Sequence, residues 1–286
     1  MMRHREFDLA ELSFSSYVIS CFEEPRPFVG LPVYPSRSFR HGNIFVNAKA
    51  GIEQPSDLRG KRVGLPEYQL TALVWIRGIL AEHHGLPADA VSYHTGGLET
   101  PGRIEKARVN LPPGISVEPI GEGKTLAKML ADGEIDALYS PRAPSTLFTG
   151  DGRVARLYPE PGVQEREYFA TTGIFPIMHV IALRRDVYER NRWLAQTLTK
   201  AFVAAKELAY RELEQVVALK VSLPWLTSEL ERTRALMGRD HWSYGVEPNR
   251  HVLETFVRYA HEQGLARELL PIEDLFAPET LESFVI

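Results

Sequence analysis

A single cysteine, Cys21, stands among the 286 residues of the sequence. One thiol excludes a disulfide framework and any metal cluster built on several cysteines. Long apolar runs are also missing, because stretches such as 177–183 are far shorter than the ~18 residues that a membrane span needs. No block of like charge is present either, since 33 Lys and Arg and 37 Asp and Glu are interspersed for a net charge of −4. These absences argue against membrane spans, basic arms for nucleic acid and acidic tails.

The composition that remains is ordinary for a globular protein, with 44% hydrophobic and 24% charged residues. A length of 286 residues favours two lobes over one small core. The chain opens Met-Met-Arg-His-Arg-Glu without a signal peptide, from which we expect a cytoplasmic protein.

Short apolar stretches alternate with stretches of helical periodicity. Leu73, Ile76 and Leu80 recur at helical spacing, and Gly85 suits the position after a helix end. The polar run after the first strand, Ser13 to Ser16, is expected to be a loop. Strands that alternate with helices favour an α/β fold with mostly parallel sheets. The pattern predicts strands at 7–12, 44–47, 61–65, 91–94, 135–139 and 177–183, and helices at 69–84, 125–131, 192–222, 228–237 and 250–263.

The order of these elements indicates two lobes. One strand group precedes residue 60, a second lies between 61 and 139, and a further buried strand with a helical tail follows. A chain that leaves one lobe, builds the second and returns has this order. We therefore expect residues 1–60 and 171–286 to form lobe 1 and residues 61–170 to form lobe 2, with a small-molecule cleft between them.

Six segments, in sequence order, carry a resemblance to a known family. They are PSRSFRH (35–41), VGLPEYQLT (63–71), WIRGIL (75–80), TGGLE (95–99), SPRAPS (140–145) and GIFPIMH (173–179). Together they resemble the 4,5-dihydroxyphthalate decarboxylases over nearly the whole chain. The resemblance implies a two-lobed α/β fold of the type II periplasmic-binding-protein kind, with a mostly parallel sheet in each lobe. It also leads us to expect that this chain lacks the family's N-terminal strand and part of its first helix.

The resemblance implies the non-oxidative decarboxylation of a dihydroxylated aromatic dicarboxylate, from 4,5-dihydroxyphthalate to 3,4-dihydroxybenzoate. A hydroxyl para to the leaving carboxylate feeds electrons into the ring, so no cofactor is expected. The site must hold a flat dianion and protonate a ring carbon. Arginines, an acid and an apolar or aromatic wall are suited to these tasks.

Three arginines are candidates for binding the substrate's carboxylates. Arg37 and Arg40 lie three residues apart in a loop, where they could capture a carboxylate or instead be solvated or bridge the lobes. Arg142 and Ser140 follow the strand that ends at Tyr139, and ligands of open α/β sheets collect at the carboxyl ends of strands. The alternative for Arg142 is a loop arginine that pairs with a neighbouring carboxylate.

Glu67, Tyr68 and Thr71 lie between a strand and the start of the next helix. A helix N-terminus favours an anion, and the Thr71 hydroxyl can donate to one, so Tyr68 and Thr71 are candidate binding residues. Glu67 is either a proton donor or a carboxylate that stabilises the helix start, and the second case is the commoner.

His179 interrupts an apolar strand that is otherwise suited to burial on both faces. A buried neutral histidine needs a partner, and near a cleft it could protonate the ring, although a satisfied core histidine is commoner. Ser13, Ser15 and Ser16 follow the first strand and could bind a carboxylate or catechol oxygen, or form a capped turn. The proton donor is therefore His179 or Glu67.

Metal sites receive little support, because His83 and His84 are adjacent on a predicted helix and His41 and His94 are isolated. We expect no metal, no nucleic acid and no membrane partner, and a small aromatic carboxylate as ligand; association with further copies of the chain is left open. The alternative function is that of a solute-binding protein of an ABC-type uptake system, which would use the same cleft without chemistry. An effector-sensing module is not favoured, because the sequence shows neither the N-terminal DNA-binding helices nor the basic patch expected of one.

Overall fold

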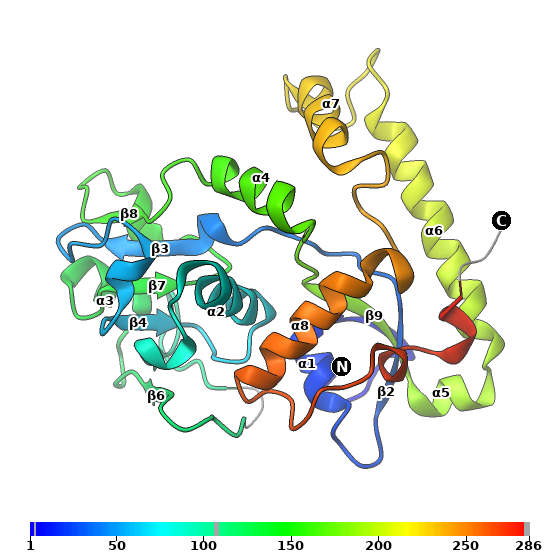
Figure 1. Cartoon of the computed structure of the whole chain (residues 1–286), viewed down its shortest axis with the longest axis horizontal. Helices are drawn as coiled ribbons and strands as arrows, with labels where there is room; N and C mark the ends of the chain where they lie inside the picture. The colour runs from blue at the N-terminus through cyan, green and yellow to red at the C-terminus, as the bar shows by residue number, and fades with distance from the viewer. Residues whose placement is uncertain (3, 106–108, 283–286) are drawn as a thin grey trace.

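The computed structural model describes residues 1–2, 4–105 and 109–282, and these residues form two β-sheets flanked by helices (Figure 1). The larger sheet has six strands in the order β6 (Ser116–Pro119), β5 (Ser92–Thr95), β4 (Arg62–Leu65), β7 (Ala137–Tyr139), β3 (Ile44–Asn47) and β8 (Val154–Arg156). The smaller sheet has the order β1 (Leu9–Ser13), β9 (His179–Arg184) and β2 (Phe28–Leu31). Within the described residues, no helix is both long and apolar enough to cross a membrane.

Strands β6, β5, β4 and β7 of the larger sheet are parallel, as the alternation of strands and helices predicts. Strands β3 and β8 extend this sheet in antiparallel pairings. Helix α2 (Thr71–His84) follows β4, and α3 (Leu126–Asp132) precedes β7. Both helices end at a glycine with positive φ, Gly85 and Gly133, which is the backbone that a glycine after a helix adopts without strain. The carboxyl ends of β4, β5 and β7 therefore meet at one edge, beside the start of α2.

The smaller sheet does not have the parallel arrangement expected for each lobe, because β9 is antiparallel to both of its neighbours. The reason lies in the path of the chain. The chain leaves the sheet at Leu31 towards the larger sheet and returns at His179, which lies at the same end of the sheet as Leu31 and Ser13. A strand that enters where the previous one leaves must run in the opposite direction.

The predicted division of the chain places residues 44–47 in lobe 1, whereas β3 pairs with β7 and β8 of the larger sheet. This difference arises because a strand's partner depends on contacts that are distant in sequence, such as Phe45 with Leu138 and Arg156. The remaining lobe boundaries stay a prediction.

Several helices differ from the sequence-based expectation. The polar run 13–16 was expected to be a loop, but its residues from Phe14 onward belong to α1 (Phe14–Ser20), because Phe14, Tyr17 and Val18 give this helix a buried face. The expected helix 192–222 is α6 (Trp193–Leu213), which ends before Val216 and Val217, two exposed β-branched residues that no packing holds in a helix. The other helices are α4 (Pro161–Thr172), α5 (Arg185–Arg190), α7 (Leu226–Met237) and α8 (Arg250–Glu262).

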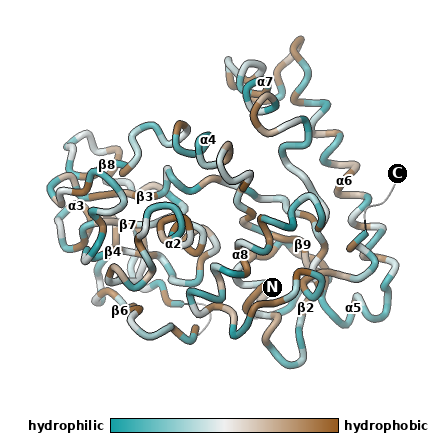
Figure 2. Tube along the Cα trace, in the orientation of Figure 1, coloured by the Kyte–Doolittle hydropathy of each residue, from teal (hydrophilic) through white to brown (hydrophobic). Residues whose placement is uncertain are grey.

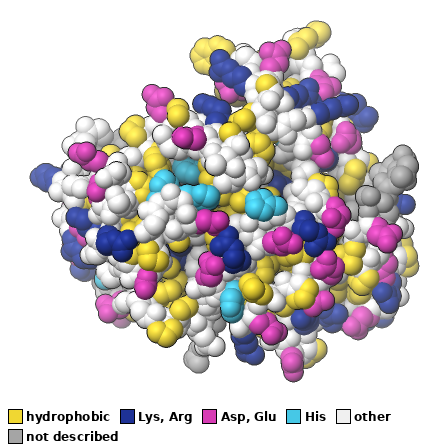
Figure 3. Space-filling view, in the orientation of Figure 1, with side chains coloured by type: hydrophobic (Ala, Val, Ile, Leu, Met, Phe, Trp, Pro, Cys, Tyr) yellow, Lys and Arg dark blue, Asp and Glu magenta, His cyan; other side chains and the backbone are white. Residues whose placement is uncertain are grey.

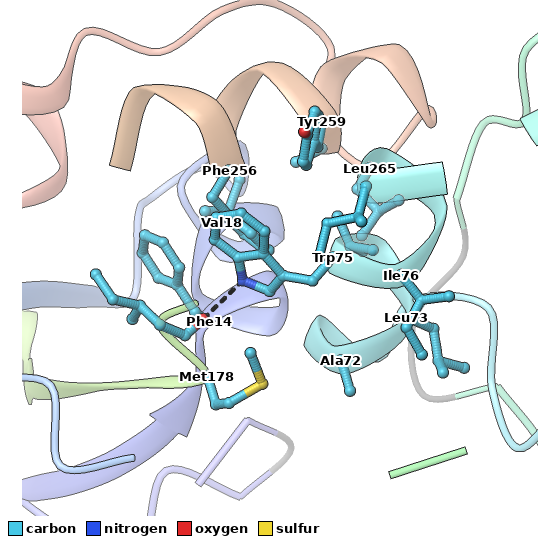
Figure 4. Packing of buried hydrophobic residues seen from close by; sticks show 14 of the residues in the cluster. Phe14, Val18, Ala72, Leu73, Trp75, Ile76, Met178, Phe256, Tyr259 and Leu265 are labelled. Carbon is cyan, nitrogen blue, oxygen red and sulfur yellow. Dashed lines mark hydrogen bonds between the residues drawn. The ribbon is translucent and has the colours of Figure 1, made fainter. Parts of the chain in front are cut away.

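Helix α2 lies on the larger-sheet side of the molecule and packs against both α1 and α8 (Figures 1 and 2). Its Trp75 is fully buried and donates a hydrogen bond from Nε1 to the Ile177 carbonyl at 2.9 Å (Figure 4). The indole lies against Phe256 of α8 at 5.4 Å between ring centroids, and Phe256 stacks on Phe14 of α1 at 4.6 Å. One aromatic cluster thus joins the helix that follows β4 of the larger sheet to the helices beside the smaller sheet.

The contact of α2 with α8 requires a glycine at position 78. A Cβ built there would lie 2.1 Å from a ring carbon of Tyr259, which is itself buried. We expect Gly78→Ala to lower the free energy of unfolding by about 1–3 kcal/mol, because the buried ring must move out of a packed core. Urea denaturation measures this change. Gly121→Ala is the matched control, since its Cβ would meet only Lys124 at 3.9 Å. Equal midpoints for the two variants would contradict the packing argument.

Candidate functional site

Three hydroxyl groups meet where the small sheet approaches the start of α2. Ser13 ends β1, Ser15 lies in the first turn of α1, and Thr71 is the first residue of α2. The Ser13 and Thr71 hydroxyls lie 2.8 Å apart, and the Thr71 hydroxyl donates to Ser15 Oγ at 3.0 Å. Thr71 Oγ1 also accepts the backbone N–H of Ser15 at 2.9 Å. The structure thus brings together three of the predicted binding residues, which we call the hydroxyl cluster.

The hydroxyl cluster joins the two halves of the molecule, because β1 and α1 belong to the small-sheet side whereas α2 follows β4 of the larger sheet. Ser15 and Thr71 are buried, and Ser13 is half-buried. Helix α2 has no side-chain cap at its N-terminus, so its first N–H groups and its dipole face this region. Hydroxyl donors beside an uncapped helix start suit a carboxylate ligand. Ser16, the third predicted serine, is half-buried on α1.

His179 lies directly beside the hydroxyl cluster, because it is the Cα partner of Ser13 in the antiparallel pair of β1 and β9. Side chains of such partners lie on the same face of the sheet, about 5 Å apart at Cβ. The expectation of a buried histidine is wrong: its side chain is 40% exposed. The strand begins at His179, so this residue lies at the edge of the sheet, whereas Val180 to Leu183 after it are buried.

The Nδ1 atom of His179 is hydrogen-bonded to the Glu11 carboxylate. A carboxylate at Nδ1 fixes the ring orientation and leaves Nε2 as the nitrogen that can exchange a proton with a ligand. Sequence reasoning missed Glu11, which lies two residues before Ser13 and therefore on the same face of β1. Only the pairing of β1 with β9 could have identified it, because the two residues are 168 positions apart.

A pocket of about 640 Å³ opens at the carboxyl edge of the larger sheet. It adjoins the hydroxyl cluster, because Leu70, the residue before Thr71, lines it. The exposed Arg142 and the buried Ser140 lie in its wall, as the position after β7 predicts. Ser140 Oγ accepts the backbone N–H of Arg142 at 3.2 Å, which fixes the start of this loop. Its other lining residues are Pro66, Gly97, Leu98, Glu99, Thr100, Pro101, Gly102, Arg103, Pro141 and Ala143.

Arg37 and Arg40, predicted as a pair, point to different partners. The buried Arg37 donates to the Ser243 carbonyl at 2.7 Å and to the Asn249 side chain. Arg40 is half-buried and donates to Met178 Sδ at 3.1 Å and to Asn43 Oδ1 at 3.3 Å. Burial lowers the pKa of each guanidinium to about 10. The structure therefore does not bring these two arginines to one ligand.

Glu67 and Tyr68 are both almost fully buried. The Glu67 carboxylate contacts the Arg103 guanidinium, with Nε at 2.7 Å and Nη2 at 2.5 Å from the same oxygen. The Tyr68 hydroxyl donates to the Gln263 carbonyl at 3.1 Å, after α8, and burial raises its pKa. Tyr68 thus anchors α8, while Glu67 holds Arg103, which lines the 640 Å³ pocket.

Metal-ligating side chains do not converge in this region. Across residues 1–2, 4–105 and 109–282, no group of three or more His, Cys, Asp or Glu side chains could hold a metal ion. What the site provides is hydroxyl donors, a helix N-terminus, an exposed arginine and a histidine oriented by a carboxylate.

The proteins that resemble this chain include two relatives with the same name. The 4,5-dihydroxyphthalate decarboxylase of Comamonas testosteroni is 43% identical over 284 residues, which are 99% of this chain and 86% of that protein. The 4,5-dihydroxyphthalate decarboxylase of Pseudomonas putida is 48% identical over 159 residues, which are 56% of this chain and 62% of that protein. No protein-family model matches the chain.

The structures are periplasmic binding proteins. A putative sulfonate-binding protein SsuA of Methylobacillus flagellatus shares 18% identity at a TM-score of 0.53, over 96% of this chain and 73% of its own. The aliphatic sulphonate-binding protein SsuA of Escherichia coli shares 13% identity at a TM-score of 0.50, over 98% of this chain and 83% of its own. These similarities confirm the expected two-lobed α/β fold of the periplasmic-binding-protein kind.

Replacement of Thr71 tests the hydroxyl cluster. Thr71→Val keeps the side-chain shape but leaves the buried Ser15 N–H without its acceptor, so we expect a loss of about 1–3 kcal/mol in unfolding free energy. Thr71→Ser keeps the hydroxyl and should remain close to the parental protein. Urea denaturation of both variants measures the difference. The cluster is not a stabilising contact if Thr71→Val unfolds at the parental midpoint.

Proposed function

Because the chain belongs to the 4,5-dihydroxyphthalate decarboxylase family, we propose that it converts 4,5-dihydroxyphthalate to 3,4-dihydroxybenzoate and carbon dioxide. The observation that carries this function is the 43% identity to the Comamonas testosteroni decarboxylase over 99% of the chain. The chain is therefore a carboxy-lyase that acts without oxidation of its substrate.

The reaction replaces one aryl carboxylate by a proton. The bond between the ring and the carboxylate breaks, carbon dioxide leaves, and its electron pair remains at the ring carbon, which then takes a proton. The hydroxyl para to the leaving group supplies electron density to the ring. The protein must therefore hold the second carboxylate, orient the flat ring and deliver one proton.

We propose that the hydroxyl cluster and the start of α2 hold a carboxylate of the substrate. Ser13 and Ser15 supply hydroxyl donors there, Thr71 orients Ser15 by donating to its Oγ, and the helix dipole favours a negative charge. The adjoining pocket of about 640 Å³ has room for one aromatic ring. We assign the other carboxylate to Arg142, which is exposed in the wall of this pocket, since a guanidinium matches planar oxyanions.

We propose His179 rather than Glu67 as the proton donor. His179 is exposed beside the hydroxyl cluster, and Glu11 orients its ring. The carboxylate of Glu67 is buried against Arg103, so a ring carbon would have to displace that ion pair to reach it. Glu11 is accordingly a positioning residue that acts through His179.

Incubation of the protein with 4,5-dihydroxyphthalate tests the function. We expect the ultraviolet spectrum to change to that of 3,4-dihydroxybenzoate, with one carbon dioxide released per substrate consumed. Spectroscopy and carbon dioxide capture in the same reaction measure both products. A sample without protein is the control. Saturable binding of the substrate with no release of carbon dioxide would instead favour a solute-binding protein.

Substitutions in the site separate chemistry from binding. We expect His179→Ala to lower kcat at least about 100-fold with little change in KM, because general acid catalysis contributes about that much or more. Arg142→Ala should mainly raise KM, by about tenfold, because it removes a charge that binds the ground state. Steady-state kinetics measure both parameters.

The control for the histidine is His251→Ala, an exposed position on α8, which should retain the parental kinetics. Glu11→Gln should lower kcat less than His179→Ala does, since it leaves the imidazole in place. The assignment of His179 is wrong if His179→Ala turns over at the parental rate.

A further inference from the structure

A second, smaller pocket lies at the other end of α2. It has a volume of about 200 Å³ and is lined by His41, His83, His84, Tyr158, Gln164, Glu167, Tyr168, Thr171 and Thr172. Figure 3 shows histidine side chains gathered on the surface between α2 and α4. This pocket shares no lining residue with the 640 Å³ pocket. Helix α2 has 14 residues, so its two ends are about 20 Å apart.

The walls of this pocket are aromatic rings that come from separate parts of the chain. His41, in a short turn before β3, lies 5.1 Å from Tyr168 of α4 and 5.9 Å from Tyr158 between ring centroids. His83, at the end of α2, meets Tyr168 edge-on at 5.3 Å. These rings form a cavity whose size and surface suit one further flat ring.

Three polar atoms in this wall are buried without a hydrogen-bond partner in the part of the chain that the structure describes. They are Nδ1 of His41, the hydroxyl of Tyr168 and Oε1 of Gln164. His41 is only 5% exposed and Tyr168 only 7%. An unpaired polar atom in the interior is costly, and three of them around one cavity indicate a ligand that carries hydroxyl groups.

The charge of the pocket further limits the class of ligand that it can bind. Burial lowers the pKa of His41 to about 4, so its imidazole is neutral at pH 7. The lining contains no arginine or lysine, and its one charged carboxyl residue is Glu167. A carboxylate would find no cation there, whereas an uncharged ring with hydroxyl groups would meet both donors and acceptors.

We propose that this pocket binds one small, uncharged catechol-type ring, stacked among His41, His83 and Tyr168. One ring hydroxyl donates to Oε1 of Gln164, which can only accept. The second hydroxyl donates to Nδ1 of the neutral His41 and accepts from the Tyr168 hydroxyl. The ligand differs from the substrate and product of the decarboxylation, which carry carboxylates, so this site is separate from the reaction.

Titration calorimetry with catechol at pH 7.5 tests this site. We expect saturable binding at a single site and a Kd that rises about tenfold in Tyr168→Phe, which removes one hydroxyl and keeps the ring. Gln164→Met, a second variant of similar size, should weaken binding to a similar extent. The matched control is Tyr188→Phe, because Tyr188 lies on α5 and its hydroxyl donates to Glu279 instead. Circular dichroism confirms that each variant is folded.

Two further measurements separate this site from the decarboxylation. Arg142→Ala should leave catechol binding unchanged, and Tyr168→Phe should keep the parental decarboxylation rate. The proposal is overturned if catechol does not bind up to millimolar concentration, or if Tyr168→Phe binds it as tightly as the parental protein. It is also overturned if catechol binding is lost in Arg142→Ala, since catechol would then occupy the larger pocket. None of these results bears on whether the protein decarboxylates 4,5-dihydroxyphthalate.

Discussion

The packing of α2 against α1 and α8 is the contact on which the rest of the structure depends. Trp75 lies at its centre, hydrogen-bonded to the Ile177 carbonyl just before β9 and in contact with Phe256 of α8. The buried Arg77 adds a second connection, since its Nε donates to Gln263 at 2.7 Å and its Nη2 to the Tyr68 carbonyl at 2.8 Å. Because α2 is bound to elements of both sheets, the position of one sheet fixes the position of the other.

The two pockets depend on this helix in different ways. Its N-terminus brings Thr71 to Ser13 and Ser15, and thereby places the hydroxyl cluster beside His179. Its C-terminus brings His83 to Tyr168 of α4. A fold shared with sulfonate-binding proteins supplies the general arrangement, but the chemistry comes from these particular side chains. The histidine that Glu11 orients is the group that we propose as the proton donor.

Local patterns in the sequence predicted the elements whose periodicity is strong. Helix α2 forms at 71–84 within the expected 69–84, and β3 forms at the expected 44–47. Weakly patterned elements were missed, because they carry little local signal. Tyr168 is the one buried residue of α4, so no apolar stripe marks that helix. Helix α1 was missed because the serines beside Phe14 made its first turn look like a polar loop. The direction of β9 followed from the return path of the chain, which local sequence does not encode.

The sequence by itself determined the α/β class, the family resemblance and the residue types that a decarboxylase site needs, since these reside in short segments. The tertiary structure alone decided which of those residues meet. It joined Ser13 to Thr71 across 58 positions, turned Arg37 towards Asn249 and paired His179 with Glu11. The physical reason is that the orientation and burial of a side chain depend on partners distant in sequence, which are brought close only when the two sheets pack around α2.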